Sequence, residues 1–439
     1  MISVRLRLRP GVFAVTDAQD AVSLLAWPHL TSLGRLDPAG RALLDELAAE
    51  PGVDAPPAGR APLVDRLRAQ GWLTVSVRAG EKLCYELEPR RPARPPGDDT
   101  VARLSRFAVI TRSDPGLVLR SPLAWCDVRL HDPRLLAAVA DPSVPGPVPG
   151  FVDDLRWAGL LATAGEADDE LRHRQWATPD LWFHAASRLG ARTGEPTGAT
   201  GWAQDRFPPL PARPPARTGT ATVLDRPDLD ALRRSDPSLT TVVEQRQSVR
   251  RHDDREPLTV RQVGEFLYRC ARVRGVRRAD GLELVDRPFP SAGALHELEL
   301  YLIARHVAGL APGVHHYDAH GHRLEHLSGI TAPAHRLVSD AGAAAGMTTP
   351  PQLVVVTAAR FGRVLWKYQD IGYALILKNA GVLCQTMYLA ATAMGLAPCA
   401  IGSGDSAAFA AATGLDPLVE GPVAEFVLGS RPAGDQEPR

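Results

Sequence analysis

The sequence predicts an α+β protein in which two small winged-helix-like units precede a larger domain. Two observations carry this prediction. Short strand and helix patterns recur in a similar order over residues 1–92 and 100–192, and a longer mixture of helical and strand patterns follows over residues 223–433. At roughly 100–200 residues per domain, a chain of 439 residues is long enough for several such units.

The composition narrows the function classes. With 45% hydrophobic and 23% charged residues and a net charge of +0, the chain resembles a globular protein without overall attraction to nucleic acid or anionic membranes. Its 5 cysteines include no C-x-x-C pair, which indicates neither a zinc cage nor a disulfide framework and favours the cytoplasm. The N-terminus lacks a signal-peptide pattern. The longest apolar stretch, 373–396, contains polar interruptions and predicts a buried helix.

The first unit, residues 1–92, has the element order of a winged helix. "SVRLRLR" alternates apolar and basic residues as a strand does, and "LDPAGRALLDELAAE" has helical spacing. "APLVDRLRAQ" predicts a second helix that ends at Gly71, and two strands around a turn at 79–81 complete the unit.

Residues 100–192 follow the proline-rich joint "RRPARPPGDD". "RFAVITRSDPGLVLRSP" predicts a hairpin, and "DPRLLAAVAD" and "FVDDLRWAGLLATAG" predict helices. Winged-helix units often serve only for packing or dimerisation. DNA binding is the alternative, but both units lack the dense basic and polar face of a DNA-reading helix. Residues 193–222 are rich in proline and glycine and are predicted to be a linker.

The third segment opens with an arginine-rich motif. In "EQRQSVRR", Arg246, Ser248 and Arg250 alternate, so their side chains are expected on one face of an extended segment. Two guanidinium groups and a hydroxyl suit an anion such as phosphate, although a solvated edge strand has the same pattern. Thr259 and Gln262 predict a capping box at the start of the next helix.

Glycine-rich turns stand at the ends of later elements. "RPFPSAG" precedes an alternating strand over 298–302, "APCAIGSGD" follows the long apolar helix, and the strand "GPVAEFVLGSR" ends at Arg431. Glycine lets a flat ring approach the backbone closely, and arginine and hydroxyl groups hold phosphate. These segments together predict a site for a phosphorylated planar cofactor.

Lysine is rare in this chain. Its three lysines are Lys82, Lys367 and Lys378, and all other residues among the 50 Lys+Arg are arginines. Lys367 directly precedes Tyr368. A buried lysine can lose its proton and act as a base, whereas arginine stays charged, so one interpretation is a chemical role for Lys367. The other is that a few lysines persist under an arginine-rich coding bias.

The order R-x-S-x-R, P-S-x-G, K-Y, C-A-I-G and L-G-S-R resembles the flavin-dependent nitroreductase superfamily over residues 223–433. Within it, the pattern resembles most closely the SagB-type azoline dehydrogenases, which form thiazoles and oxazoles in ribosomally made peptides. The resemblance implies a nitroreductase-like FMN-binding fold with a mixed or antiparallel sheet and helices. The N-terminal half resembles the same proteins in architecture.

The resemblance implies roles for individual residues. Lys367 and Tyr368 match the pair that azole-forming members need for activity, and no metal site is implied. The residues that match the FMN-binding motifs are Arg246, Ser248, Arg250, Pro290, Ser291, Gly293, Ile401, Gly402 and Arg431. His252 and His296 replace the phenylalanine and tyrosine common in the family, and His296 is expected to alter substrate fit. His315 and His316 are predicted to form a surface turn instead of a metal site.

The implied activity is the FMN-dependent oxidation of thiazoline or oxazoline rings in a precursor peptide, as in antibiotic biosynthesis, with molecular oxygen reoxidising the flavin. A cyclodehydratase would supply the azoline, and residues 1–92 would bind the leader of the precursor. We expect a cytoplasmic homodimer with flavin at its interface. The alternatives are an NAD(P)H-dependent nitroreductase or ene-reductase acting on a small molecule, and a flavin-sensing DNA-binding regulator.

Overall fold

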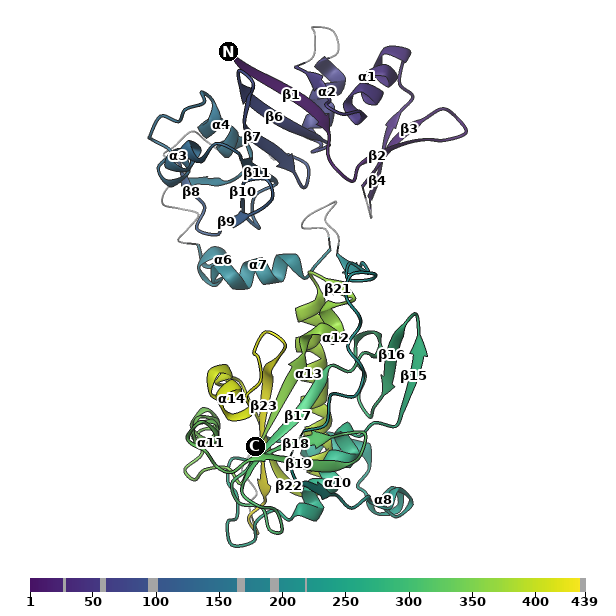
Figure 1. Ribbon diagram of the computed structural model, residues 1–439, viewed down its shortest axis with the longest axis vertical. Helices are drawn as coiled ribbons and strands as arrows, with labels where there is room; N and C mark the ends of the chain where they lie inside the picture. Colours follow the sequence, from purple (N-terminus) through teal and green to yellow (C-terminus); the bar gives the residue numbers. More distant parts are fainter. Residues whose placement is uncertain are drawn as a thin grey trace. The chain divides into compact units, whose positions relative to one another are not determined.

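The chain divides into two compact units, Met1–Pro196 and Thr197–Arg439, which we call the N-terminal unit and the C-terminal domain (Figure 1). The computed structural model describes residues 1–26, 29–55, 61–93, 102–163, 170–189, 197–217 and 219–434. Most of the joint predicted at 90–99 lies outside these residues.

Strands dominate the N-terminal unit. Its elements are β1 (Ile2–Leu8), β2 (Phe13–Thr16), β3 (Val22–Ala26), β4 (His29–Gly34), α1 (Pro38–Ala48), β5 (Val53–Asp54), α2 (Ala61–Ala69), β6 (Leu73–Ala79), β7 (Lys82–Pro89), β8 (Ala102–Leu104), β9 (Val109–Arg112), β10 (Leu117–Arg120), β11 (Cys126–Leu130), η1 (Pro133–Leu135), α3 (Leu136–Ala140), α4 (Phe151–Trp157), β12 (Leu161–Thr163), α6 (Leu171–Arg174) and α7 (Thr178–Ala186). The predicted helices and strands are among them with one correction: in "FVDDLRWAGLLATAG" the helix ends at Trp157, and Leu161–Thr163 form β12, which pairs with β8.

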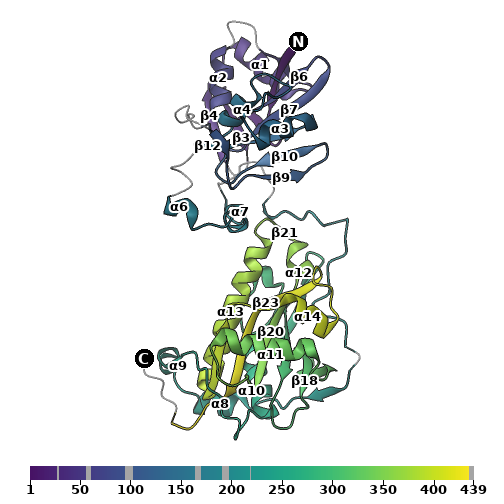
Figure 2. The ribbon, with the colours of Figure 1, turned by 90° about the vertical axis from the view of Figure 1, so that its left-hand side faces the viewer.

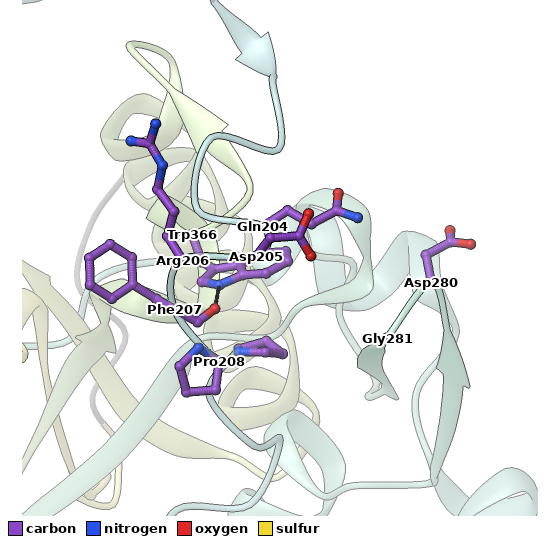
Figure 3. A pocket seen from close by; sticks show the side chains of 9 residues that line it. Gln204, Asp205, Arg206, Phe207, Pro208, Asp280, Gly281 and Trp366 are labelled. Atoms are coloured by element: carbon purple, nitrogen blue, oxygen red, sulfur yellow. Dashed lines mark hydrogen bonds between the residues drawn. The ribbon is translucent and has the colours of Figure 1, made fainter.

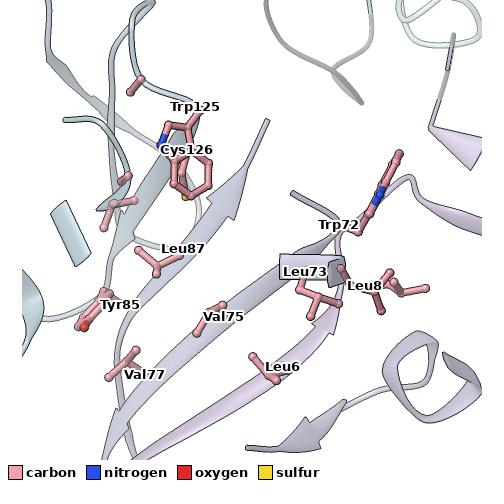
Figure 4. Close-up of a cluster of buried hydrophobic side chains, with 14 of the residues drawn as sticks. Leu6, Leu8, Trp72, Leu73, Val75, Val77, Tyr85, Leu87, Trp125 and Cys126 are labelled. Atoms are coloured by element: carbon pink, nitrogen blue, oxygen red, sulfur yellow. The ribbon is translucent and has the colours of Figure 1, made fainter. Parts of the chain in front are cut away.

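One antiparallel sheet with the order β5-β1-β6-β7-β11-β10-β9 runs through the whole N-terminal unit. β11, which the sequence patterns did not predict, pairs with β7 on one side and with β10 on the other. Apolar side chains from β1, β6, β7 and β11 therefore contribute to one common core (Figure 4). The structure thus differs from the prediction of separate units over 1–92 and 100–192, because their strands share one sheet and one core.

The alternation of "SVRLRLR" determines how β1 is oriented. Leu6 and Leu8 are buried in the core, whereas Arg5 and Arg7 pair with Asp54 and Glu50, each at 3.0 Å. Such exposed ion pairs contribute little to stability, so burial of the leucines is the main reason for this orientation.

A second sheet of the N-terminal unit, with the order β2-β3-β4, was not predicted. β3 alternates buried and half-buried residues, but all four residues of β2 are exposed. Phe13 and Val15 are 64% and 45% exposed. Among the described residues β2 pairs with β3 alone, so within them its other side is an unpaired strand edge with apolar side chains.

The C-terminal domain mixes strands and helices. Its elements are β13 (Gly198–Ala199), β14 (Ala221–Val223), α8 (Leu229–Ser235), α9 (Leu239–Gln245), α10 (Val260–Ala271), β15 (Gly275–Ala279), β16 (Leu282–Asp286), η2 (Ala292–Ala294), β17 (Leu298–Ala304), β18 (Gly313–Asp318), β19 (Arg323–Ser328), α11 (Ala332–Ala345), β20 (Leu353–Arg360), α12 (Phe361–Leu365), β21 (Tyr368–Gln369), α13 (Gly372–Ala393), β22 (Leu396–Ile401), α14 (Ser406–Thr413) and β23 (Glu420–Ser430).

Helices cover both faces of the main sheet of this domain, which has the order β14-β19-β18-β17-β20-β23-β22. α10 and α13 pack on one face and α11 and α14 on the other (Figure 2). Every residue of β17 is consequently buried. The sequence predicted an alternating strand, but β17 is a central strand with both faces covered by helices. The capping box of Thr259 and Gln262 starts α10 as predicted.

α13 is the long apolar helix predicted from the sequence. Of the helices in the described chain, it alone is long and apolar enough to cross a membrane, yet it packs against α10, α12 and β22. These contacts make it a core helix of the domain. Its opposite side is incompletely covered, since Tyr373 and Val382 are 42% and 38% exposed.

Residues 197–217, which we call the strap, belong to the C-terminal domain. Arg213 pairs with Asp318 at 2.6 Å, and Arg217 donates to the hydroxyl of Tyr301 at 2.7 Å. The prediction of a linker over 193–222 is therefore wrong for this part. Proline and glycine limit regular structure in the strap to the short strand β13, but they do not prevent an extended segment from packing on a folded surface.

His315 and His316 do not form the predicted surface turn. Both lie in β18 and are buried, and His316 bonds to Glu299 at 3.3 Å and to Glu325 at 3.2 Å. Burial alone would lower the pKa of His316, but these two carboxylates raise it. In the described chain, no group of three or more His, Cys, Asp or Glu residues is arranged to hold a metal ion.

Candidate active site

Asn379 of α13 holds the predicted Pro-Ser-Ala-Gly turn in place. Its side-chain carbonyl accepts the amide of Ala292 at 3.2 Å, and its amide donates to Ser291 Oγ at 3.2 Å and to Glu297 Oε1 at 2.9 Å. Burial raises the pKa of Glu297. Sequence analysis did not assign Asn379 to the site, although a polar residue inside an apolar helix is a usable signal.

The backbone of this turn is unusual. Gly293 has φ +61°, and the non-glycine residues Ala294 and His296 also have positive φ values of 55° and 47°. Such conformations cost of the order of 1–3 kcal/mol each for residues with a side chain, and they concentrate at functional sites.

Lys367 and Tyr368 lie directly over Gly293. A Cβ atom on Gly293 would stand 2.9 Å from the hydroxyl of Tyr368 and 3.5 Å from Nζ of Lys367. Both side chains are half-buried, and Nζ lies 5.6 Å from the centroid of the Tyr368 ring. Lys367 forms no ion pair with any described residue. The fold thus brings together the turn and the Lys-Tyr pair, which are 74 residues apart in the sequence.

The arginine-rich motif runs alongside β22 as an irregular segment. Val249 donates its amide to the carbonyl of Pro398 at 2.8 Å, and Ser248 Oγ bonds to the hydroxyl of Tyr388 at 2.7 Å. The same hydroxyl accepts the amide of Ala400 at 2.8 Å, and the guanidinium carbon of Arg246 lies 5.2 Å from the Tyr388 ring. Tyr388, which sequence analysis did not assign to the site, therefore connects this motif to α13 and β22.

The end of the motif lies beside the end of β23. Asp253 donates its amide to the carbonyl of Ser430 at 3.2 Å, next to Arg431. Nε of Arg431 is buried without a hydrogen-bond partner, and neither Arg246 nor Arg250 pairs with a carboxylate in the described chain. Unpaired guanidinium groups close to an exposed serine-containing segment suit a phosphate.

Ile401 and Gly402 line a pocket of about 210 Å³ at the end of β22, together with Tyr373 and Glu425. Nothing fills the space where a Cβ atom on Gly402 would stand. Glu425 is only 6% exposed and has no hydrogen-bond partner among the described residues. Burial, assisted by the nearby Asp405 and Asp340, raises the pKa of Glu425 to about 7.

Most of the predicted site residues form two groups within one copy of the chain. The turn group contains Pro290, Ser291, Gly293, Lys367 and Tyr368. The arginine group contains Arg246, Ser248, Arg250 and Arg431. Ile401 and Gly402 belong to neither group and line the pocket with Tyr373. Asn379 contacts the first group and Tyr388 the second. At about 1.5 Å per residue, these two side chains leave α13 at points about 13 Å apart.

The two histidines that depart from the family pattern fill packing positions. The ring of His252 lies against Gly429, where a Cβ atom would stand 2.2 Å from it, and burial lowers the pKa of His252 to about 4. His296 packs edge-on against Phe289 at 5.0 Å, and burial lowers its pKa to about 3. Both imidazoles are therefore neutral near pH 7. The effect of His296 on substrate fit stays a prediction.

A larger pocket, of about 420 Å³, lies between the strap and the turn that joins β15 to β16 (Figure 3). It is lined by Gln204, Asp205, Arg206, Phe207, Pro208, Pro209, Asp280, Gly281 and Trp366. Trp366 is the sequence neighbour of Lys367, so this pocket opens beside the segment that carries the Lys-Tyr pair.

Residues 243–430 match the model of the nitroreductase family. The C-terminal domain is a nitroreductase family domain. Proteins of this family are in general FMN-dependent oxidoreductases. The match confirms the nitroreductase-like fold that the sequence motifs predicted.

Two relatives match the nitroreductase domain by sequence. The nitroreductase-like protein MJ1384 of Methanocaldococcus jannaschii is 29% identical over 185 residues, which cover 42% of this chain and 86% of that protein. The trifolitoxin-processing protein TfxB of Rhizobium leguminosarum bv. trifolii is 25% identical over 165 residues, or 37% of this chain and 44% of TfxB. The chain thus spans less than half the length of TfxB.

Two solved structures are also similar. A nitroreductase from Anabaena variabilis is 21% identical with a TM-score of 0.39 over 56% of this chain and 45% of that one. The Escherichia coli microcin synthetase McbBCD complex, solved with truncated pro-MccB17 bound, contains a chain that is 21% identical with a TM-score of 0.35, over 48% of this chain and 85% of that one.

Proposed function

We propose that the protein oxidises thiazoline or oxazoline rings in a ribosomally made peptide to thiazoles or oxazoles, with FMN as cofactor. The observation that carries this proposal is the Lys367–Tyr368 pair over Gly293 in a nitroreductase domain. Similarity to TfxB, a trifolitoxin-processing protein, adds support. A cyclodehydratase of the same pathway would supply the azoline, and a cytoplasmic location is part of the proposal.

The residues present fit FMN. Its phosphate and the polar edge of its ring would be held by Arg246, Ser248, Arg250 and Arg431. The guanidinium groups of the three arginines lack carboxylate partners in the described chain, and Nε of Arg431 is buried without a hydrogen-bond partner. The flat ring would lie against Ile401 and Gly402, because nothing fills the space where a Cβ atom on Gly402 would stand. Pro290, Ser291 and Gly293 would lie beside the ring, where the Lys-Tyr pair covers Gly293.

Oxidation of an azoline removes one proton and one hydride, and the ring becomes aromatic. When bound, FMN would supply the hydride acceptor. Nζ of Lys367 would take the ring proton, and the hydroxyl of Tyr368 would hold the heterocycle or relay that proton. Their common position over Gly293 brings both groups to one small area of the turn.

The decisive experiment is mass spectrometry of an azoline peptide after incubation with the FMN-loaded protein. We expect a loss of two hydrogens per ring, with oxygen consumed. An unchanged peptide, together with oxidation of NAD(P)H in the presence of a nitroaromatic or an enone, would instead favour the nitroreductase or ene-reductase alternative. The similarity to MJ1384 is the observation that favours this second candidate.

We propose a homodimer that uses the uncovered side of α13. The separation of the turn group and the arginine group along α13 supports this, because a second copy can bring one group opposite the other. Val382→Glu is expected to yield monomers and to release FMN, since a charge would enter an apolar interface. Sedimentation and flavin absorbance measure both effects.

Val276→Glu is the matched control, because Val276 is 46% exposed on β15 and lies outside α13. It should leave the dimer and its flavin intact. A wild-type protein that is monomeric at micromolar concentration and retains FMN would contradict the dimer proposal.

We propose further that the leader of the precursor adds a strand to β2 in the N-terminal unit. Natural sheet edges are usually protected by charges or proline, whereas β2 presents Phe13 and Val15. Its apolar edge is thus suited to pairing with an extended peptide.

Proline at Ala14 tests this edge without breaking the β2–β3 pairing. The amide of Asp17 donates to the carbonyl of Ala21 at 3.0 Å, so these two residues form a hydrogen-bonded pair. Hydrogen-bonded and non-hydrogen-bonded pairs alternate along an antiparallel ladder. Ala14, three residues before Asp17, is therefore in a non-hydrogen-bonded pair with Leu24, and its amide points away from β3. Ala14→Pro should weaken leader binding by about two- to tenfold, as expected for one lost hydrogen bond. Fluorescence anisotropy with a labelled leader measures this, and turnover of a leaderless azoline should not change.

Ile110→Pro on β9 is the matched control. Ser113 donates to Gly116 at 3.0 Å, so by the same alternation the amide of Ile110 points away from β10 at the edge of the larger sheet. Weaker binding in Ile110→Pro with normal binding in Ala14→Pro would place the leader on the other edge and contradict the assignment to residues 1–92.

A further inference from the structure

The strap is bonded to the segment that carries Lys367 and Tyr368. β13 pairs antiparallel with β21, so that Ala199 stands opposite Tyr368 and Gly198 opposite Gln369. Thr200 Oγ1 bonds to Gln369 Oε1 at 2.6 Å. The backbone of Tyr368 is therefore held from one side by the strap.

Two indole groups, one on each segment, add hydrogen bonds between the strap and the segment before Lys367. Trp202 of the strap donates its Nε1–H to the carbonyl of Leu365 at 2.7 Å. Trp366 donates its Nε1–H to the carbonyl of Phe207 in the strap, also at 2.7 Å (Figure 3). These bonds fix the chain on the N-terminal side of Lys367, as the β13–β21 pairing fixes it at Tyr368.

Arg363 connects the strap to the turn that faces the Lys-Tyr pair. Its guanidinium group donates to the carbonyl of Leu210 in the strap at 2.7 Å and to that of Leu295, two residues after Gly293, at 2.6 Å. Arg363 is 2% exposed. A buried guanidinium group with carbonyl acceptors on both segments holds them at a set distance from each other.

We infer that the strap is a part of the active site that positions Lys367 and Tyr368 over Gly293, with Trp202 as a positioning residue. This inference rests on the proposed function of the Lys-Tyr pair. If the inference holds, a change in the strap directly affects turnover. The physical reason is that Lys367 has no ion pair of its own in the described chain, so the bonds that hold its backbone set the region that Nζ can reach.

Trp202→Phe tests the inference because it removes one N–H group and keeps an aromatic ring at a position that is 40% exposed. We expect kcat on an azoline peptide to fall by about two- to tenfold with KM and FMN affinity unchanged. With a ring-deuterated azoline, the kinetic isotope effect should rise, because proton or hydride transfer becomes slower. A merely structural role would lower the active fraction and leave the isotope effect unchanged.

Trp182→Phe is the matched control. Trp182 donates its Nε1–H to the carbonyl of Phe107 at 2.9 Å within the N-terminal unit, so the same chemical change removes a comparable bond outside the strap. Its kcat and isotope effect should equal those of the wild type. Equal losses in both variants would contradict the inference.

The three lysines of the chain provide a readout that does not depend on the substrate. Labelling with an amine-selective reagent, followed by peptide mass spectrometry, compares Lys367 with Lys82 in the same sample. In Trp202→Phe the labelling rate of Lys367 should change by about two- to tenfold, whereas that of Lys82 should not. Unchanged labelling would overturn the inference. A change in labelling with no azoline oxidation by the wild type would support the strap and contradict only the proposed function.

Discussion

Replacement of Lys367 by alanine is expected to lower kcat on an azoline peptide by about 10²–10⁴-fold while the flavin spectrum stays intact. The ring proton is weakly acidic, and Nζ of Lys367 is the basic group that the fold places over Gly293. A general base typically contributes on this scale. The flavin should stay bound, because Lys367 is separate from the arginines proposed to hold its phosphate.

Lys367→Arg is the sharper variant. Arginine keeps the positive charge but cannot accept a proton at working pH, so we expect it to be nearly as inactive as alanine. Steady-state oxidation, followed by mass spectrometry of the peptide, gives the rates. Near-normal turnover in Lys367→Arg would mean that the residue supplies only charge.

The control for these variants is Lys82→Arg. Lys82 lies in the N-terminal unit and pairs with Asp132 at 2.9 Å, an ion pair that arginine can also form, so turnover should not change. Tyr368→Phe separates the two roles proposed for the tyrosine: loss of a relay hydroxyl should slow turnover, whereas a stacking ring would be preserved.

Replacement of Arg246 or Arg431 by alanine is expected to weaken FMN binding by about 10- to 150-fold. A charge-assisted hydrogen bond contributes about 1.5–3 kcal/mol, and each variant would lose at least one. Arg431 is the stronger case, since its buried Nε has no partner within the described chain and would be satisfied by the phosphate. Titration of apoprotein with FMN, followed by flavin fluorescence, measures the affinities.

Arg261→Ala is the control for charge alone. Arg261 is exposed on α10 and forms no ion pair in the described part of the chain. It removes the same charge from the same domain and should leave FMN affinity nearly unchanged. Full FMN occupancy in both Arg246→Ala and Arg431→Ala would falsify their assignment to the phosphate site.

Local sequence signals predicted much of the secondary structure. The alternation in β1, the helical spacing in α1 and the capping box of α10 act through neighbours in the chain, and each appears where it was predicted. Local signals did not predict which distant strands pair. β11 lies between two strands from different halves of the N-terminal unit, and no local pattern indicates that partnership. For this reason the two halves were predicted as separate units.

Burial was also misjudged where it depends on distant partners. His315 and His316 looked like residues of a polar turn, yet His316 is stabilised in the core by Glu299 and Glu325 from neighbouring strands. The strap was predicted to be a linker for the same reason. Its proline and glycine content disfavours long helices and strands, but its bonds to Leu365, Gln369 and Arg363 come from a segment more than 150 residues away.

The sequence by itself determined the types of chemical group available and their order: two arginines around a serine, a glycine turn, a Lys-Tyr pair and a terminal arginine. Those are local properties of the chain, and they were sufficient to predict the nitroreductase-like fold. Only the tertiary structure decided which groups meet. It placed Lys367 and Tyr368 over Gly293, held the turn with Asn379 and divided the predicted residues between two parts of α13. The reason is physical: hydrogen bonds and burial act between atoms that are close in space, and closeness in space is set by the packing of the whole domain.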